Sequence, residues 1–327
     1  MTAGLNGHHS QHTGRVLAGS GPGRALSAVV LLAGSVRPND LSLAIDRSLL
    51  DLPIDNDQTV LSLWQQQVEA LAAAMGLERL PLRIVIDQNG REPSVPSPEK
   101  HVTLTVERDA KDFRGTGGLL RDLAISYGPD DLLLIANAAQ ILIEPLPELA
   151  SALFNAGGSV SFIGHRDGTP CGLFLVRAGV LKTIRDVGFL DFKEQVLPKL
   201  PVEGHSVCHV MRETATAHPI RTLDGYLAGV RACARVRAGL PRETDPFSED
   251  WSATFAVAEP GVTVDSSATI HDSVILRGAT VERGAVVVRS VVGPGATVRT
   301  GEIVADRAVG VGGEPVAPRR TRGATPA

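Results

Sequence analysis

The sequence predicts an α/β domain followed by a short parallel β-helix. Two observations carry this prediction. Between Ser27 and Arg237, short apolar runs alternate with segments of helical periodicity, which is typical of strands and helices that alternate along the chain. From Gly261 to Val311, the sequence repeats with a period of 17 residues. A chain of 327 residues is long enough for two such domains.

The repeat places a β-branched aliphatic residue at the same three positions of each copy. These are Val264, Val281 and Val298 at position four, Ile270, Val287 and Val304 at position ten, and Ile275, Val292 and Val309 at position fifteen. The spacing of six and five residues fits neither an α-helix nor a flat strand. A parallel β-helix accounts for it, because each short strand sends one side chain inward before the chain turns a corner. A small antiparallel β-sandwich is the alternative, but it gives no reason for one register to persist over 51 residues.

Small residues two positions before these aliphatics fit a narrow interior. They are Ala268, Ala279, Ala285, Ala296, Ser273 and Ser290. In the third copy, Glu302 and Arg307 take two of these places, as expected for an atypical terminal repeat. Three coils bury little surface, so we expect them to pack on the preceding domain, on another subunit, or on both.

The α/β region opens with Ser27–Gly34, a continuous apolar run that ends in glycine and is typical of a buried parallel strand. Because the run is short and an α/β pattern follows it, we favour a strand over the signal peptide that it could mimic. Further strands are expected at Leu82–Ile86, Val102–Val106, Asp131–Ala136, Ser159–Gly164 and Gly172–Val176, and helices at Thr59–Met75, Gly115–Tyr127, Leu146–Asn155, Asp191–Leu197 and Leu223–Arg237. This order predicts a mostly parallel sheet with helices on both faces.

The domain boundaries follow from composition. Residues 25–240 are predicted to form the α/β domain, 241–259 a linker with prolines and acidic residues, and 260–312 the β-helix. Residues 1–24 and 313–327 lack periodicity and are predicted to be disordered tails.

Composition also bounds the partners and the compartment. The net charge of −4 argues against nucleic acid as a partner, and no apolar run reaches the roughly 18 residues of a membrane-spanning helix. Cys171, Cys208 and Cys233 are far apart and lack metal-ligand spacing. We therefore expect reduced thiols and a cytoplasmic location.

Ligands of α/β sheets bind at the carboxyl ends of the strands, and the loop after the first strand is the first candidate. It begins at Ala33 and Gly34, whose backbone can approach a phosphate closely. Arg37 and Arg47 follow as candidate phosphate-binding cations. The alternative is that these are surface arginines on a long loop.

Two further loops fall at the same edge of the predicted sheet. The turn Gly115-Thr116-Gly117-Gly118 would admit a flat base or a phosphate, although a glycine-rich helix start is an equally good interpretation. The loop that begins at Asn137 contains no acidic residue before Glu144. A metal-dependent phosphoryl-transfer enzyme would need a carboxylate there to hold Mg²⁺.

Residues 27–311 resemble the sugar-1-phosphate nucleotidyltransferases, such as the mannose-1-phosphate guanylyltransferases. VVLLAG resembles their opening strand, GTGG-LL at 115–120 is similar to G-T-A-G-A-L, LLLIANAAQIL is similar to a strand ending in N-G-D, GTPCGLFLV at 168–176 looks like their sugar-contacting strand, and HPIRTLDGYL at 218–227 is similar to D-I-G-T-x-x-x-Y-L. The resemblance implies a Rossmann-like domain joined to a left-handed β-helix. It also implies nucleotide contacts from Ala33, Gly34, Arg37, Arg47, Gly115, Thr116, Gly117 and Gly118, and sugar contacts from Asn137 and Gly172.

The sequence departs from this family where the metal binds. The two aspartates that hold Mg²⁺ in the family align with Ala139 and Pro219. The family's G-x-G-T-R loop reads Ser35-Val36-Arg37-Pro38, its lysine is replaced by Arg47, and its sugar-contacting glutamate–lysine pair has no counterpart. Without a divalent ion, the repulsion between a sugar phosphate and a nucleoside triphosphate is largely unshielded. We therefore expect a catalytically impaired relative that binds a nucleotide or sugar nucleotide, and we assign no catalytic or metal-binding residue.

Two other functions remain open from the sequence. One is an active, Mg²⁺-dependent sugar-1-phosphate nucleotidyltransferase with a rearranged metal site, in which Glu144 or Asp224 lies near the Gly115–Gly118 turn. The other is an acyltransferase that acts on the β-helix through His271, unless that histidine is a solvent-facing corner residue.

Protein partners follow from the same interpretation. We expect a second copy of the chain bound through the open ends of the β-helix, or an active homologue that this chain regulates. We expect neither nucleic acid nor a membrane as a partner.

Overall fold

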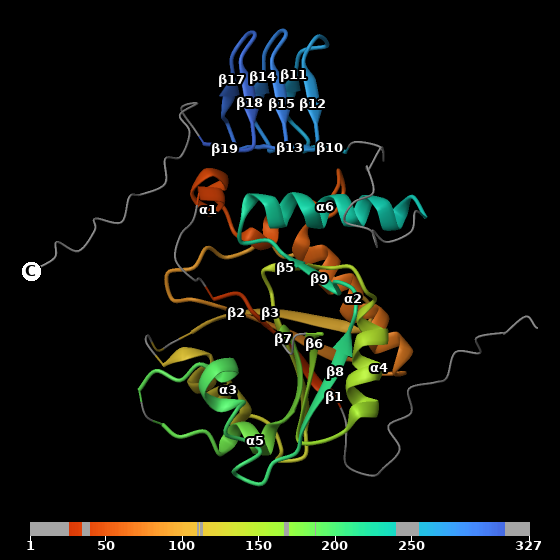
Figure 1. The fold of residues 1–327 in the computed structure, drawn as a ribbon, viewed down its shortest axis with the longest axis vertical. Helices are drawn as coiled ribbons and strands as arrows, with labels where there is room; N and C mark the ends of the chain where they lie inside the picture. The colour runs from red at the N-terminus through yellow and green to blue at the C-terminus, as the bar shows by residue number, and fades with distance from the viewer. Residues whose placement is uncertain are drawn as a thin grey trace, which may run out of the picture.

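The computed structural model describes residues 26–34, 40–109, 111, 114–166, 170–186, 188–239 and 255–310. Its larger part is a seven-stranded sheet in the order β3-β2-β1-β4-β7-β6-β8 (Figure 1). The strands are β1 (Leu26–Leu32), β2 (Leu80–Ile86), β3 (Val102–Arg108), β4 (Leu132–Asn137), β6 (Val160–His165), β7 (Pro170–Arg177) and β8 (Val207–Arg212). Strand β7 runs antiparallel to β4 and β6, and the other pairings are parallel. The prediction of a mostly parallel sheet is confirmed.

Helices cover both faces of this sheet, as the sequence predicted (Figure 1). Helices α2 (Val60–Ala74) and α4 (Leu146–Ala156) share a core with one face, whereas α3 (Gly115–Ala124) and α5 (Ala178–Lys182) share a core with the other. The remaining helical segments are α1 (Asp40–Ile45), the 3₁₀ turn η1 (Leu49–Asp51), the π-helical turn η2 (Phe192–Val196) and α6 (Leu223–Arg237). None of the helices in the described ranges combines the length and apolarity needed to cross a membrane.

Local sequence explains how the first elements form. Ala28, Val29, Val30 and Leu31 of β1 are fully buried because helices pack on both sides, which accounts for the unbroken apolar run. Helix α2 begins after Thr59, whose hydroxyl accepts a hydrogen bond from the Ser62 amide while the Ser62 hydroxyl accepts one from the Thr59 amide. This capping box satisfies two amides at the start of the helix.

The carboxyl-terminal part of the chain passes through three parallel sheets in turn. Their orders are β10-β13-β16-β19, β11-β14-β17 and β12-β15-β18. The strands are β10 (Ala256–Ala258), β11 (Thr263–Val264), β12 (Thr269–His271), β13 (Ser273–Ile275), β14 (Thr280–Val281), β15 (Val286–Val288), β16 (Val291–Val292), β17 (Thr297–Val298), β18 (Ile303–Ala305) and β19 (Ala308–Val309). We call residues 255–310 the coil region.

The register of the coil region is the one that the repeat predicts. Each predicted aliphatic pairs with its equivalent in the next coil: Val264 with Val281 and Val281 with Val298, Ile270 with Val287 and Val287 with Val304, and Ile275 with Val292 and Val292 with Val309. Most of these aliphatics form one internal core with the small alanines. In the last coil, Arg307 donates a hydrogen bond of 3.2 Å to Glu302, so the two atypical residues of the third repeat pair with each other.

The coil region begins earlier than the sequence predicted. Strand β10 pairs with β13 through Ala256–Ser273, Val257–Val274 and Ala258–Ile275. These residues fall in the stretch 241–259 that was predicted to be a linker, because β10 precedes the first full repeat and carries no repeat signature. Residues 241–254 of that stretch, and both predicted tails, lie outside the described residues.

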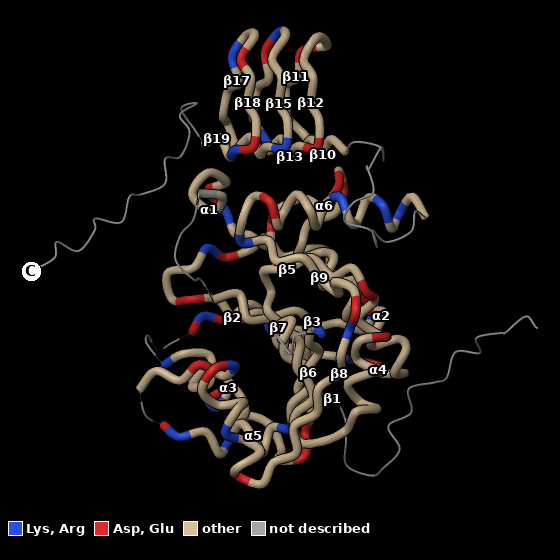
Figure 2. The backbone as a smooth tube through the Cα atoms, viewed as in Figure 1, with Lys and Arg blue, Asp and Glu red and all other residues tan. Residues whose placement is uncertain are grey.

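One sheet of the coil region packs against the α/β domain. Val274, Leu276, Val291 and Ala308 belong to the same buried cluster as the core around α2 and α4. The approach is close at Gly293, where an added Cβ would lie 2.3 Å from the Ala44 carbonyl of α1. Figure 1 shows the coil region stacked on α1 and α6, and Figure 2 shows acidic and basic positions along the same junction.

Candidate functional site

The strand order places the candidate site at the carboxyl edge of β1 and β4. Strand β1 pairs with β2 on one side and with β4 on the other. Strands β2 and β3 therefore extend the sheet on one side of β1, and the later strands extend it on the other side. Open α/β sheets bind ligands at such a switch point, outside the carboxyl ends of the strands.

The loop after β1 approaches the end of β2. A Cβ added to Gly34 would lie only 2.7 Å from Oδ1 of Asp87, the residue that follows β2. The Ala33 amide continues the sheet by donating to the Val85 carbonyl at 2.8 Å. Asp87 was not among the residues predicted from the sequence, although an acidic residue directly after a predicted parallel strand is a usable signal. The predicted phosphate ligand Arg37 lies outside the described residues.

The two predicted sugar-binding residues lie next to each other. Asn137 ends β4, and Gly172 lies near the start of β7, which pairs with β4. A Cβ added to Gly172, whose φ is +83°, would lie 3.2 Å from Cβ of Asn137. The Asn137 side chain is held in a turn, because its Oδ1 accepts a hydrogen bond of 3.0 Å from the Ala139 amide. Burial raises the pKa of the neighbouring Cys171 thiol, which keeps it protonated at neutral pH.

Ala139 and Pro219 also lie side by side, although the sequence separates them by 80 residues. Strand β5 (Gln140–Leu142) pairs antiparallel with β9 (Ala217–Pro219), with Gln140 opposite Pro219. The Ile220 amide donates to the Ala139 carbonyl at 3.1 Å. The two positions that align with the metal-binding aspartates of the resembled family therefore meet at the carboxyl edge, and neither carries a carboxylate.

The two acids that the sequence offered as replacements, Glu144 and Asp224, do not form a metal-binding group here. Glu144 is buried and paired with Arg212 at 3.1 Å, and Asp224 is exposed in the first turn of α6. Across the part of the chain that the structure describes, no three His, Cys, Asp or Glu side chains converge as a metal-binding group.

The Gly115–Gly118 turn has a packing role that the sequence did not reveal. A Cβ on Gly115, whose φ is +69°, would lie 2.3 Å from the Leu190 carbonyl, and one on Gly117 would lie 3.0 Å from the same oxygen. The Gly117 amide donates to that carbonyl at 2.8 Å, and the Thr116 hydroxyl accepts from the Phe192 amide at 2.8 Å. A Cβ on Gly118 would lie 3.0 Å from Cβ of Arg114. These residues make room for the segment around Leu190, so nucleotide binding is not needed to explain the glycines.

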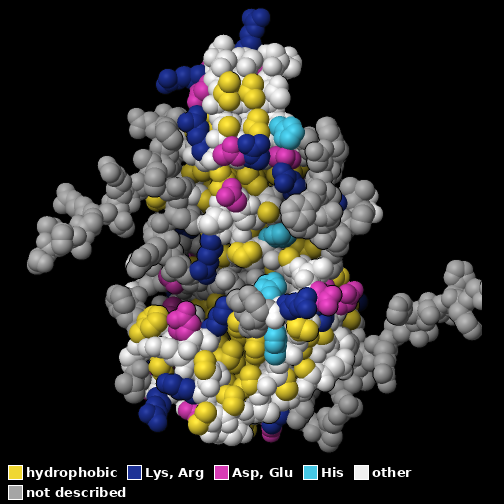
Figure 3. All heavy atoms as spheres, in the orientation of Figure 1, with side chains coloured by type: hydrophobic (Ala, Val, Ile, Leu, Met, Phe, Trp, Pro, Cys, Tyr) yellow, Lys and Arg dark blue, Asp and Glu magenta, His cyan; other side chains and the backbone are white. Residues whose placement is uncertain are grey.

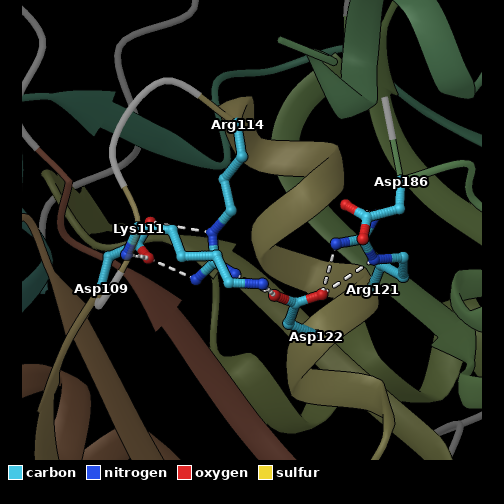
Figure 4. Close-up of polar contacts among 6 residues, drawn as sticks. All are labelled: Asp109, Lys111, Arg114, Arg121, Asp122 and Asp186. Atoms are coloured by element: carbon cyan, nitrogen blue, oxygen red, sulfur yellow. Dashed lines mark hydrogen bonds and ion pairs between the residues drawn. The ribbon is translucent and has the colours of Figure 1, made fainter. Parts of the chain in front are cut away.

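The basic residues around α3 are paired with carboxylates, as Figure 4 shows. Arg114 bridges Asp109 and Asp122, Arg121 bridges Asp122 and Asp186, and Lys111 reaches Asp122 at 3.1 Å. Burial acts to raise the pKa of Asp122, but hydrogen bonds from Arg121 and Lys111 outweigh it and lower the pKa. Three cations face three carboxylates here, so this cluster leaves no surplus positive charge for a phosphate.

Arg47 is paired with an acidic residue that is distant from it in the sequence. Its guanidinium donates two hydrogen bonds of 2.7 Å to Glu259, at the start of the coil region. Arg47 was predicted to bind a phosphate, and nothing in the sequence indicated its pairing with Glu259, because the two residues are 212 apart.

His271 lies at a corner of the coil region and is exposed. Its Nδ1 is 3.2 Å from Oδ2 of Asp272, which also accepts a hydrogen bond of 2.7 Å from Arg231 of α6. Asp272 is buried at this junction and has a φ of +48°. The contacts tie the corner to α6, which favours the structural interpretation of His271 over the acyltransferase hypothesis.

Comparison with known proteins adds little. No protein-family model matches this sequence, and no curated protein matches it significantly. Among solved structures, HddC from Yersinia pseudotuberculosis is similar at a TM-score of 0.46 and 12% identity, covering 63% of this chain and 99% of that one. A Mycobacterium tuberculosis rv0371c homologue from Mycobacterium sp. strain JC1 is similar at a TM-score of 0.42 and 15% identity, covering 64% of this chain and 98% of that one. Similarities this weak assign no family.

Proposed function

We propose that this protein binds a nucleotide or sugar nucleotide in a site derived from that of the sugar-1-phosphate nucleotidyltransferases, and that it is impaired in nucleotidyl transfer. The observation that carries the proposal is the contact between Ala139 and Ile220, which brings Ala139 and Pro219 together at the carboxyl edge. Two positions that match the metal ligands of a family by sequence motif are adjacent, yet neither has a side chain that can bind a cation.

The physical argument concerns charge. Transfer of a nucleotidyl group joins two polyanions and releases pyrophosphate, and a bridging Mg²⁺ neutralises the charge that develops. Among the described residues near the edge, Glu144 is committed to Arg212 and the cations around α3 are committed to carboxylates. The transition state would therefore lack its main source of stabilisation, whereas binding that depends on shape and backbone contacts would survive.

The proposed ligand contacts come from the edge itself. Gly34, Asn137 and Gly172 lie at the carboxyl ends of β1 and β4, where a ligand bound at the switch point would meet them. Gly115–Gly118 and Arg47 drop out of the proposed site because Leu190 and Glu259 occupy them. On the basis of these contacts we place the protein in sugar-nucleotide metabolism. The free thiols support a cytoplasmic location.

We also propose that the coil region is a left-handed parallel β-helix through which two copies associate. Its three parallel sheets and its period of 17 residues support the β-helix, and the resemblance supports its handedness. Ile303, which is 68% exposed, and the hydrophobic side chains on its surface in Figure 3 support association. Light scattering should give the mass of a dimer or larger assembly, and a monomer would contradict this part.

Pyrophosphate release tests the proposed loss of catalysis. Wild-type protein is incubated with Mg²⁺, each nucleoside triphosphate and a set of sugar 1-phosphates, and we expect no turnover above the protein-free rate. The matched variant carries Ala139→Asp and Pro219→Asp, and we expect it to gain Mg²⁺ binding. Robust turnover by the wild type would contradict the proposal and favour an active enzyme with a rearranged metal site.

A further inference from the structure

Gln140 is a buried polar residue, and no contact described so far explains why a polar side chain occupies this position. The residue is 4% exposed, and among the described residues its Nε2 has no hydrogen-bond partner. A buried amide group without a hydrogen-bond partner destabilises the fold, so native proteins rarely keep one without a reason.

The backbone around Gln140 is fixed on several sides. The Trp64 indole donates to the carbonyls of Ala138 and Gln140 at 3.1 and 3.2 Å, and the Ala138 amide donates to the Leu32 carbonyl at 3.0 Å. The Gln140 amide donates to the Ala138 carbonyl at 2.8 Å. The turn from β4 into β5 is thus held by α2 and β1, which presents the side chain in a defined direction.

That direction is toward Gly172. Ile141 packs on α6, because its Cδ1 lies 2.9 Å from a Cβ added to Gly229. Neighbouring residues of a strand point to opposite sides, so Gln140 faces away from α6. Its Oε1 lies 3.7 Å from a Cβ added to Gly172, which places the side-chain amide beside the glycine and close to Asn137.

We infer that the Gln140 side-chain amide donates a hydrogen bond to a hydroxyl of the sugar of a bound sugar nucleotide. This inference rests on the proposed function and adds a residue that selects the sugar. An amide is suited to this task because it carries two donors and one acceptor, and it needs no metal to orient it. The ligand would satisfy the Nε2 group, and an analogue without a sugar would leave it unsatisfied.

A purely structural role makes a different prediction. If Gln140 only fills space, Gln140→Leu should fold at least as well and leave the ligand preference unchanged, because no hydrogen bond of Nε2 is lost. If Gln140 selects the sugar, the same variant should fold but lose discrimination. Fold stability and sugar preference therefore separate the two roles.

The test is titration calorimetry with matched ligand pairs, GDP-mannose against GDP and UDP-glucose against UDP. For the pair that the wild type binds, we expect Gln140→Leu and Gln140→Glu to weaken the sugar nucleotide about tenfold and the nucleoside diphosphate less than about twofold. Gln65→Leu is the matched control, because Gln65 is also buried but donates to the Ser97 carbonyl, and it should leave the ratio unchanged.

The outcomes separate this inference from the proposed function. An unchanged ratio in Gln140→Leu would overturn the role of Gln140 and leave the proposed function standing. No binding of either pair by the wild type would contradict the proposed function, and the role of Gln140 would fall with it. Unfolding of Gln140→Leu, with Gln140→Glu folded and unchanged in preference, would assign Gln140 to the fold alone.

Discussion

Glu259 binds Arg47 across the junction between the two parts of the molecule. Both oxygens of the Glu259 carboxylate accept hydrogen bonds of 2.7 Å from the Arg47 guanidinium, and one of them also accepts the Arg277 amide at 2.6 Å. The Arg47 side chain is 21% exposed and the Glu259 side chain 11%. The segment after α1 and the first coil are therefore linked by a partly buried, bidentate ion pair.

Removing one partner of this pair should destabilise the fold. Arg47→Met leaves the Glu259 carboxylate partly buried without its cation, and we expect a loss of about 2 kcal/mol in the free energy of unfolding, below the value for fully buried pairs. The control is Arg289→Met, because the Arg289–Asp306 pair is more than half exposed and screened by solvent, so its loss should change the free energy of unfolding much less. Urea denaturation measures both. Equal losses would mean that Arg47–Glu259 behaves as a surface pair.

The same pair predicts a pH dependence. Burial acts to raise the pKa of Glu259, but hydrogen bonds from Arg47 and from the Arg277 amide outweigh it and bring the pKa below the ordinary value of 4.5. A carboxyl with a lowered pKa in the folded state contributes stability that is complete above 4.5 and is lost as the pH falls through the folded-state value. Wild type should therefore lose its advantage over Glu259→Gln as the pH falls below 4.5. An advantage that does not change with pH would contradict this.

Gly115 should tolerate no side chain. Gly115→Ala forces a Cβ against the Leu190 carbonyl at 2.3 Å and adds left-handed strain, so we expect a loss of about 3 kcal/mol in the free energy of unfolding. Gly76→Ala is matched in conformation, with a φ of +65° and no atom within 4 Å, and should cost about 1 kcal/mol. Thermal denaturation compares them. Similar losses would show that backbone strain alone explains both glycines.

The α/β domain and the coil region should unfold together. Leu276 is fully buried and belongs to the core cluster that joins the two parts. We expect one calorimetric transition for the wild type, and Leu276→Ala should lower its free energy of unfolding by about 2–4 kcal/mol. Two separate transitions in the wild type would show that the shared core does not couple them.

The sequence predicts the fold well because its signals are local or periodic. The repeat gives the register of Val264, Val281 and Val298 directly, and Thr59 marks the start of α2. Strand β10 and the pair β5–β9 escape prediction because each strand has only three residues and depends on a distant partner. No window of sequence contains that partner.

The candidate site is less predictable for the same reason. The order of the motifs along the sequence was enough to predict that Asn137 lies near Gly172 and that Ala139 lies near Pro219. It could not reveal that Leu190 packs on Gly115 or that Glu259 binds Arg47, because residue types at a glycine-rich turn or a loop arginine suit both packing and ligand binding. The sequence also offered no reason to single out Gln140, because the inferred role of its side chain rests on burial without a hydrogen-bond partner, which only the structure shows.

The most direct measurement is calorimetric titration of wild-type protein with sugar nucleotides, once in Mg²⁺ and once in EDTA. Because Ala139 and Pro219 offer no ligand for a cation, we expect one sugar nucleotide to bind with the same affinity in both buffers, within about twofold. Binding that disappears in EDTA would mean that a metal ion holds the ligand, and would contradict a site that works without one.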